Sequence, residues 1–200
     1  MKKNIWLMVS VALLFAACSQ SQSNTQSQKK SSPHMPPKGP VHFTFSNPVI
    51  KKYGEEHYFK QVAVQPDTTM NYKILFFIVK NDHPKKVNFG LEHMAKMINL
   101  LHDAGVKQDH IHLVGIMTGR ATACTVADSL YQKIYHINNP NDTLLTELTN
   151  QGHAKLYVCS QALAEMGYDG SYLNHNIKRA LSAITTVAIY QLKGYAMLKF

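Results

Sequence analysis

Cys159 carries the strongest chemical signal in the sequence, and it lies in the stretch LYVCSQALAEMGY at residues 156–168. The apolar residues before it are typical of a strand, and the pattern after it predicts a short helix. A cysteine at the start of a helix meets free backbone N–H groups and the positive end of the helix dipole, which lower a thiol pKa. We therefore predict that Cys159 is a nucleophile. The alternative is an inert thiol that packs in the core like an alanine.

Cys124 follows a second apolar run, residues 111–117, which also predicts a buried strand. In a parallel sheet both cysteines would then lie at the carboxyl edge. A helix predicted over residues 121–135 would carry four residues on its apolar side: Cys124, Ala127, Tyr131 and Ile134. This position favours core packing. The alternative is a resolving thiol that pairs with Cys159, which requires that their Cα atoms lie close together.

Two weaker features could hold an anion near these thiols. Gly119 and Arg120 follow the second strand, and a glycine beside an arginine at a helix N-terminus can bind an anion. Ser160 and Gln161 follow Cys159 directly and would open the next helix. All four are candidate anion- or ligand-binding residues.

The eleven histidines do not predict a metal site. His110 and His112 form an H-x-H pair that would share one face of a strand, but no third ligand follows at a recognisable spacing. The sequence also lacks a Walker loop, a G-x-G-x-x-G turn and a G-x-S-x-G nucleophile elbow. We therefore expect neither a metal nor a cofactor.

Apolar runs and amphipathic segments alternate along the chain. Strands are predicted over residues 72–80, 111–117, 154–160, 177–181 and 195–200. Helices are predicted over residues 89–104, 121–135 and 142–150, directly after Cys159, and over residues 183–193, the last largely buried. This alternation is typical of an α/β fold with parallel strands and right-handed crossovers. Ligands in such folds bind at the carboxyl ends of the strands.

The N-terminus has the pattern of a bacterial lipoprotein signal peptide over residues 1–17. Lys2 and Lys3 precede an apolar run at Ile5–Ala17, which is too short to span a bilayer. The run ends in LFAAC, which resembles a lipobox and predicts acylation of Cys18, so that a lipid bilayer is a predicted partner. Ser19, in place of an aspartate, favours the outer membrane of the cell envelope. The alternative is an ordinary secretory signal and a soluble periplasmic or secreted protein.

The remaining chain would divide into three parts. Residues 18–40 hold the acylated cysteine and a tether rich in Ser, Gln and Pro, residues 41–70 form an arm that packs on the domain, and residues 71–200 form one domain. The formal net charge is +9, but the basic residues are scattered and form no stripe interleaved with aromatic residues. We therefore predict no nucleic acid partner.

The region from Tyr72 to Phe200 resembles the DsrE/DsrF-like family in the order and spacing of several blocks. These blocks are INLLHDAGV, LVGIMTGRAT, NNPND with TLLTELTNQG, YVCSQAL, and LSAITTVAIYQLKGYAMLKF. The segment PVIKKYG is similar to the arm that precedes the domain in exported members. Three residues depart from the family pattern. Thr118 stands where histidine is common, Ser160 where glycine is usual, and Ala162 where serine is usual.

The resemblance implies a flavodoxin-like three-layer sandwich with a mostly parallel five-stranded sheet, assembled into a homo-oligomer. In cytoplasmic sulfur-relay members the motif cysteine carries a persulfide and passes sulfur to a partner, and that role maps onto Cys159. Because export separates this chain from cytoplasmic acceptors, the sulfur donor and the acceptor thiol would lie in the cell envelope. We therefore predict a membrane-anchored sulfur carrier with sulfurtransferase-like activity. The alternative is a non-enzymatic oligomeric envelope module that binds a small ligand or a protein, with Cys159 structural.

Overall fold

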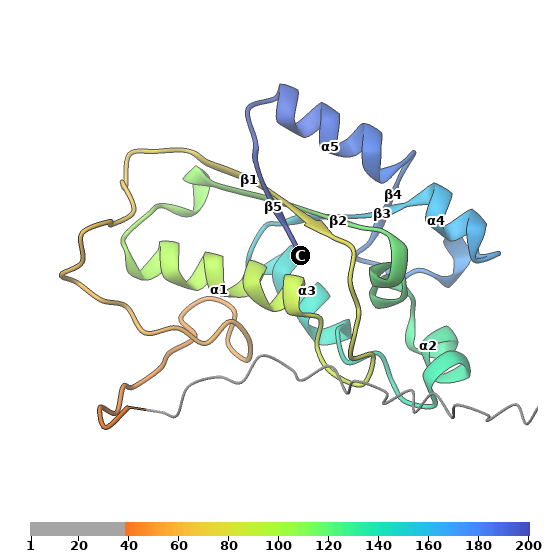
Figure 1. The fold of residues 1–200 in the computed structure, drawn as a ribbon, viewed down its shortest axis with the longest axis horizontal. Coiled ribbons are helices and arrows are strands. Elements are labelled where there is room, and N and C mark those ends of the chain that lie inside the picture. The colour runs from red at the N-terminus through yellow and green to blue at the C-terminus, as the bar shows by residue number, and fades with distance from the viewer. Residues whose placement is uncertain (1–38) are drawn as a thin grey trace, which may run out of the picture. The chain divides into compact units, whose positions relative to one another are not determined.

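Five parallel strands form one sheet at the centre of the fold (Figure 1). The strands are β1 (Tyr72–Ile78), β2 (Ile111–Met117), β3 (Lys155–Cys159), β4 (Lys178–Ala180) and β5 (Ala196–Lys199). Their spatial order is β4-β3-β2-β1-β5, and every neighbouring pair is parallel. The predicted fold class, an α/β sandwich around a five-stranded parallel sheet, is confirmed.

This computed structural model describes residues 39–200, in which His42–Phe200 form one unit. The predicted signal peptide, the predicted acylation site at Cys18 and nearly all of the predicted tether lie outside the described residues. Within residues 39–200, no helix is both long enough and apolar enough to cross a membrane.

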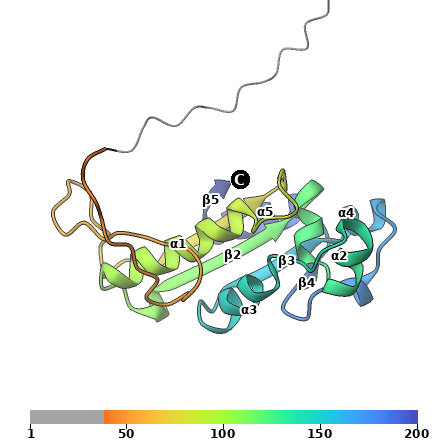
Figure 2. The same ribbon diagram turned by 90° about the horizontal axis from the view of Figure 1, so that it is seen from below.

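Helices cover both faces of the sheet, as Figures 1 and 2 show. The helices α1 (Phe89–Asp103) and α3 (Asp142–Asn150) lie on one face. The helix α5 (Ala183–Leu192) lies on the other face, and α2 (Asp128–Tyr135) lies beyond the carboxyl end of β2. The helix α4 (Ser160–Glu165) follows the end of β3, with Ala162 in the smaller core and Leu163 in the larger one. Because parallel strands are joined by such crossovers, the carboxyl ends of all five strands meet at one edge of the sheet.

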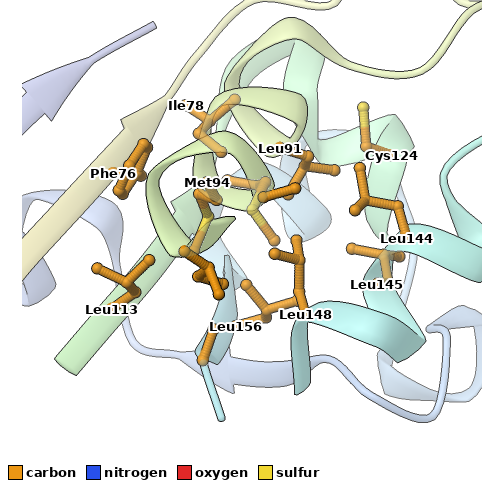
Figure 3. Packing of buried hydrophobic residues seen from close by; sticks show 14 of the residues in the cluster. Phe76, Ile78, Leu91, Met94, Leu113, Cys124, Leu144, Leu145, Leu148 and Leu156 are labelled. Atoms are coloured by element: carbon orange, nitrogen blue, oxygen red, sulfur yellow. The ribbon is translucent and has the colours of Figure 1, made fainter. Parts of the chain in front are cut away.

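The larger core lies between the sheet and the helices α1 and α3 (Figure 3). Its members include Phe76, Ile78, Leu113 and Leu156 from the strands, and Leu91, Met94, Leu144, Leu145 and Leu148 from the helices. Successive strand residues point to opposite faces, so Leu75 and Val114 enter a second, smaller core that also holds Cys159. Burying one large apolar side chain contributes about 1.5–3 kcal/mol, so the larger core supplies most of the apolar stabilisation.

The helix predicted over residues 121–135 is wrong in its first half. Gly119–Thr125 form a 3₁₀ helix, and α2 begins only after it. Between the two, Val126 is extended and pairs with Leu173 in an antiparallel bridge, which holds the backbone out of the helical region. The predicted apolar stripe is therefore broken, and Ile134 is exposed.

The helix predicted over residues 183–193 forms as α5, but it is not largely buried. Within the described chain only Ala183 and Thr186 of this helix are buried. Ile184 and Leu192 are 82% and 89% exposed. The helix carries apolar residues on all sides, and only one side rests on the sheet. An exposed apolar side of this kind commonly marks a contact with another molecule.

The arm is fixed to α1 by the side chain of Asn99, which is fully buried. Its Oδ1 accepts hydrogen bonds from the backbone N–H groups of Val49 (3.1 Å) and Ile50 (2.9 Å). Its Nδ2 donates to the carbonyl oxygens of Tyr53 (3.0 Å) and Gly54 (3.1 Å). Both polar atoms of the side chain are thereby paired, and Ile50 enters the larger core.

Glu56 makes the stability of the folded arm depend on pH. Its side chain is fully buried, Oε1 accepts from the Ser46 hydroxyl (2.9 Å), and Oε2 has no hydrogen-bond partner among the described residues. Burial, together with the adjacent Asp103, raises the pKa of Glu56 above its ordinary value of 4.5. Folding therefore favours the protonated form. The stability that this contributes is complete below pH 4.5 and is lost as the pH rises through the raised pKa.

Glu56→Gln is expected to remove this loss of stability, because glutamine keeps the shape of the side chain and carries no charge. Urea unfolding of wild type and variant from acid to neutral pH measures the effect. The exposed neighbour, in Glu55→Gln, provides the matched control and should keep the wild-type pH dependence. If the urea midpoint of Glu56→Gln falls with pH as steeply as that of wild type, Glu56 is not the group that titrates.

Candidate functional site

Cys159 is the last residue of β3 and the N-cap residue of α4. It is level with Ala180 in the neighbouring strand β4. Its side chain lies in the smaller core and is 4% exposed. This position is compatible with both an inert and a reactive thiol, so the groups around the sulfur decide between them.

The surroundings of the sulfur favour the thiolate. Burial raises the pKa of the Cys159 thiol, because it removes the charged form from water. The backbone N–H groups of Ala162 and Ala183 lower the pKa. The Thr118 hydroxyl and the backbone N–H group of Gln161 lower it further. Together these donors outweigh burial, and the pKa of Cys159 lies below its ordinary value.

Two of the donors belong to the first turn of α4, whose N–H groups have no partner within the helix. An N-cap side chain usually offers an oxygen to the N–H groups of the second and third helical residues, here Gln161 and Ala162. Cys159 offers sulfur at this place, and its side chain makes no capping hydrogen bond. Deprotonation turns the weak acceptor into a charged one, so these N–H groups stabilise the thiolate much more than the thiol.

The other two donors come from α5 and from the end of β2. Ala183 is the first residue of α5, and the N-cap residue Ser182 accepts from the Thr185 N–H group (3.1 Å), which leaves the Ala183 N–H group for the sulfur. Thr118 directly follows β2. The sulfur of Cys159 therefore lies where the N-termini of α4 and α5 meet the end of a neighbouring strand.

Cys124 lies in the larger core (Figure 3), whereas Cys159 lies in the smaller one. Burial raises the pKa of the Cys124 thiol to about 12, although a contact with Asn88 lowers it in part. Both cysteines are free. The two thiols belong to different core clusters. This position agrees with the core packing that the sequence favours for Cys124, and its role as a resolving thiol stays a prediction.

Gly119 and Arg120 are not part of this donor set. Gly119 has a φ of +54°, and a Cβ atom there would lie 3.3 Å from the carbonyl oxygen of Val79, so glycine allows the tight turn after β2. The guanidinium group of Arg120 forms an ion pair with Asp82 at the surface. Arg120 is therefore already engaged, and it does not contribute to the lowered pKa of Cys159.

Ser160 and Gln161 lie beside the thiol, as their sequence positions require. Ser160 is half-buried in the first turn of α4. Gln161 contributes its backbone N–H group to the sulfur, and its side-chain Nε2 donates to the carbonyl oxygen of Leu181 (3.2 Å). This second contact ties α4 to the segment that leads into α5.

Sequence reasoning does not find two of the four donors. Thr118 stands out in the sequence only as a departure from a family pattern. Ala183 carries no signal, because its backbone N–H group reaches the sulfur only through the pairing of β4 with β3 and the turn that follows.

Histidine and acidic side chains form no metal cluster of three or more groups within residues 39–200. His110 Nδ1 is 3.2 Å from the carbonyl oxygen of Thr68, and His112 Nε2 is 3.3 Å from Oδ1 of Asn71. Each member of the H-x-H pair therefore contacts the segment that precedes β1.

The fold and the site together define an α/β protein with a thiol held by hydrogen-bond donors at the carboxyl edge of a parallel sheet. The model of the DsrE/DsrF-like family matches residues 73–200, and the protein belongs to this family. Membership indicates a function of the sulfur-relay type.

Solved structures similar to this chain include a protein of unknown function, MTH1491, from Methanobacterium thermoautotrophicum. Its sequence is 19% identical to this chain, and the TM-score is 0.50. The match covers 64% of this chain and 99% of MTH1491. The ychN protein from E. coli is 14% identical with a TM-score of 0.45, over 64% and 99%. A search of curated proteins gave no match. The likeness to MTH1491 supports the fold alone.

Proposed function

We propose that this protein carries sulfane sulfur as a persulfide on Cys159, in the bacterial cell envelope. The observation that carries the proposal is the position of Cys159 at the N-cap of α4 beside the start of α5, where backbone donors lower the pKa of its thiol despite burial. The thiolate is the nucleophile in sulfur exchange, and Cys124 belongs to a different core cluster. The site therefore favours a persulfide on Cys159 over a disulfide between Cys159 and Cys124. A persulfide also agrees with the sulfur-relay function that membership of the family indicates.

Loading and unloading need no external oxidant or reductant. The Cys159 thiolate attacks the outer sulfur of a donor R–S–SH, a new S–S bond forms, the donor's S–S bond breaks, and R–S⁻ leaves. An acceptor thiolate R′–S⁻ then attacks the outer sulfur of Cys159–S–SH. R′–S–SH forms, and Cys159 leaves as a thiolate that the same donors stabilise. Because Cys159 is 4% exposed, the site favours a small donor such as a polysulfide.

We further propose that acylated Cys18 anchors the domain to the outer membrane, so that donor and acceptor thiols belong to the envelope. The support is the LFAAC signal followed by Ser19. Acyl chains contribute about 0.8 kcal/mol per buried CH₂ group, so two or more hold a domain firmly. Cys18→Ser should move the protein from the membrane fraction to the soluble fraction, and a variant that still pellets with membranes would contradict the anchor.

Intact mass of the mature chain with Cys18→Ser, before and after treatment with polysulfide, tests the sulfur carrier. We expect a gain of one or more sulfur atoms that a reductant removes. Cys159→Ser should abolish the gain. Cys124→Ser is the matched control and should load as wild type does, because Cys124 lies in the other core.

Loading that persists in Cys159→Ser would overturn the proposal. So would a chain in which both thiols resist polysulfide and alkylation until it unfolds, since Cys159 would then be core packing. A mass two units light before treatment, restored by reductant, would show a disulfide between the two cysteines instead.

A second candidate function is a homo-oligomeric module, and the exposed side of α5 favours it. Ile184 and Leu192 lie on that helix with most of their side chains in solvent, next to the exposed Leu181. A second copy that packs on α5 would bury this surface and would also narrow access to the Cys159 site, because Ala183 begins the same helix.

Ile184→Asp is expected to convert the oligomer to a monomer, because a contact between two copies would bury a charge at each α5. Light scattering during gel filtration measures the mass. Val64→Asp in the arm is the control, because Val64 is 86% exposed and Ile184 is 82% exposed. A monomeric wild type, or an oligomer that survives Ile184→Asp, would contradict a contact through α5.

A further inference from the structure

A large cavity lies at the ends of β1 and β5, away from Cys159. Its volume is about 940 Å³, and its walls are the loop from β1 to α1, the start of α1 and the end of β5. Cys159 is not among the residues that line it. A volume of this size suits a small organic molecule.

The cavity lies where the topology of a parallel sheet creates a crevice. From β1 the chain proceeds through β2 and β3 to β4 on one side, and α5 then returns it to β5 on the other side of β1 (Figure 1). The helices α1 and α5 lie on opposite faces of the sheet. Ligands of open α/β sheets bind outside the carboxyl ends of the strands at such a reversal of strand order.

Aromatic rings form one wall of the cavity. Phe200 stacks on the buried ring of Phe76, with 5.4 Å between the ring centroids. The ring centroid of Phe89 lies 6.0 Å from that of Phe200 and 4.0 Å from that of His93. Phe89 is nevertheless 67% exposed, at the first residue of α1. An exposed phenyl ring beside a cavity offers apolar surface and a π face to a ligand.

The charges at the cavity favour an anion. Lys80 and Lys86 line it and form no ion pair among the described residues, whereas the ammonium group of Lys199 lies over the Phe77 ring, 5.9 Å from its centroid. Two acidic side chains also line the cavity, and one of them has a partner of opposite charge. Asp82 pairs with Arg120, and Oε1 of Glu92 accepts from the Gly54 N–H group (2.7 Å).

We propose that this cavity binds a small organic anion with an aromatic or similarly flat apolar body. The body lies against Phe89 and Phe200, and the negative group lies near Lys80 and Lys86. A neutral ligand would gain no attraction from these two exposed lysines, and a cation would be repelled by them. The site is separate from the sulfur chemistry, because β2 stands between β1 and β3 in the sheet.

Two matched probes test the proposal on the mature chain with Cys18→Ser. Anilinonaphthalene sulfonate is an aromatic anion, and N-phenylnaphthylamine has the same rings without the charge. We expect the sulfonate to bind at one site, roughly tenfold more tightly than the neutral probe, with an affinity that falls as salt is added. Equal affinities, or binding of the sulfonate that salt does not weaken, would overturn the assignment of an anion site.

Variants locate the site. Phe89→Ser should weaken the sulfonate by about tenfold or more, and Lys86→Gln should weaken the sulfonate while leaving the neutral probe unchanged. Leu192→Ser removes an exposed apolar side chain from α5, and Lys133→Gln removes an exposed lysine from α2, so both are controls that should bind as wild type does. Lys86 is exposed, and its replacement leaves the fold intact even if Phe89→Ser does not. Binding that is lost in Leu192→Ser and kept in Lys86→Gln would place the probe on α5 and refute the cavity.

Discussion

Replacing Asn99 with leucine is expected to lower the free energy of unfolding by about 3 kcal/mol or more. Leucine has a similar size and can make none of the hydrogen bonds that Asn99 makes with the arm. A buried polar group that loses its partner costs about 1–3 kcal/mol. Here backbone N–H groups and backbone carbonyl oxygens both lose their partner. These groups recover partners only in water, so the arm is expected to leave α1.

Urea unfolding measures the free energy of unfolding. Limited proteolysis measures whether the arm has left α1, because a detached arm should be cleaved before the sheet is. Asn150→Leu, at the exposed end of α3, is the matched control and should change the free energy by less than about 0.5 kcal/mol. A comparably small change for Asn99→Leu, with the arm still protected, would show that apolar packing of Ile50 holds the arm without the hydrogen bonds.

The sheet could be predicted from sequence because its central strands are buried on both faces. β1 and β2 are nearly continuous apolar runs, and such runs occur in parallel sheets covered by helices on both sides. α1 could be predicted equally well, because its apolar residues recur at helical spacing and Gly105 follows its end. In these elements the local pattern and the tertiary packing favour the same structure.

The errors arise where a distant segment decides the local structure. Residues 121–127 have a helical pattern, but the bridge between Val126 and Leu173 holds them in another conformation, and no local signal reports that pairing. In α5 the apolar composition predicts burial without saying what covers the helix. The single chain covers one side of it, and the apolar residues on its other side are exposed.

The candidate site shows the same division. The junction at Cys159 could be predicted, because a strand and a helix adjoin there in the sequence. The electrostatics of the site could not, because the Thr118 hydroxyl follows β2 and the Ala183 N–H group begins α5, and the two meet at Cys159 only once the strands have paired. The two cysteines show the same limit, since a sequence can place two thiols at one edge of the sheet without assigning each to a core cluster.

Thr118→Val is expected to slow the alkylation of Cys159 near neutral pH by about tenfold. Valine keeps the branched shape of threonine and removes the hydroxyl that helps to lower the pKa of the thiol. A hydrogen bond to a charged group contributes about 1.5–3 kcal/mol, which corresponds to a tenfold or larger change in the thiolate population. Since the pKa is already lowered in wild type, the reaction should become slower as the pH falls, and the variant should need a higher pH to reach the same rate.

The pH dependence of alkylation in native protein measures the effect, with mass spectrometry to assign each thiol. Cys124 provides an internal control, because burial raises the pKa of its thiol to about 12 and it should not react until the protein unfolds. Thr143→Val, an exposed position on α3, is the matched variant and should leave the rate unchanged. A hydroxyl that only packs against the sulfur would alter the stability of Thr118→Val but not the midpoint of its pH–rate curve. An unchanged midpoint would therefore show that the backbone N–H groups of α4 and α5 hold the thiolate without Thr118.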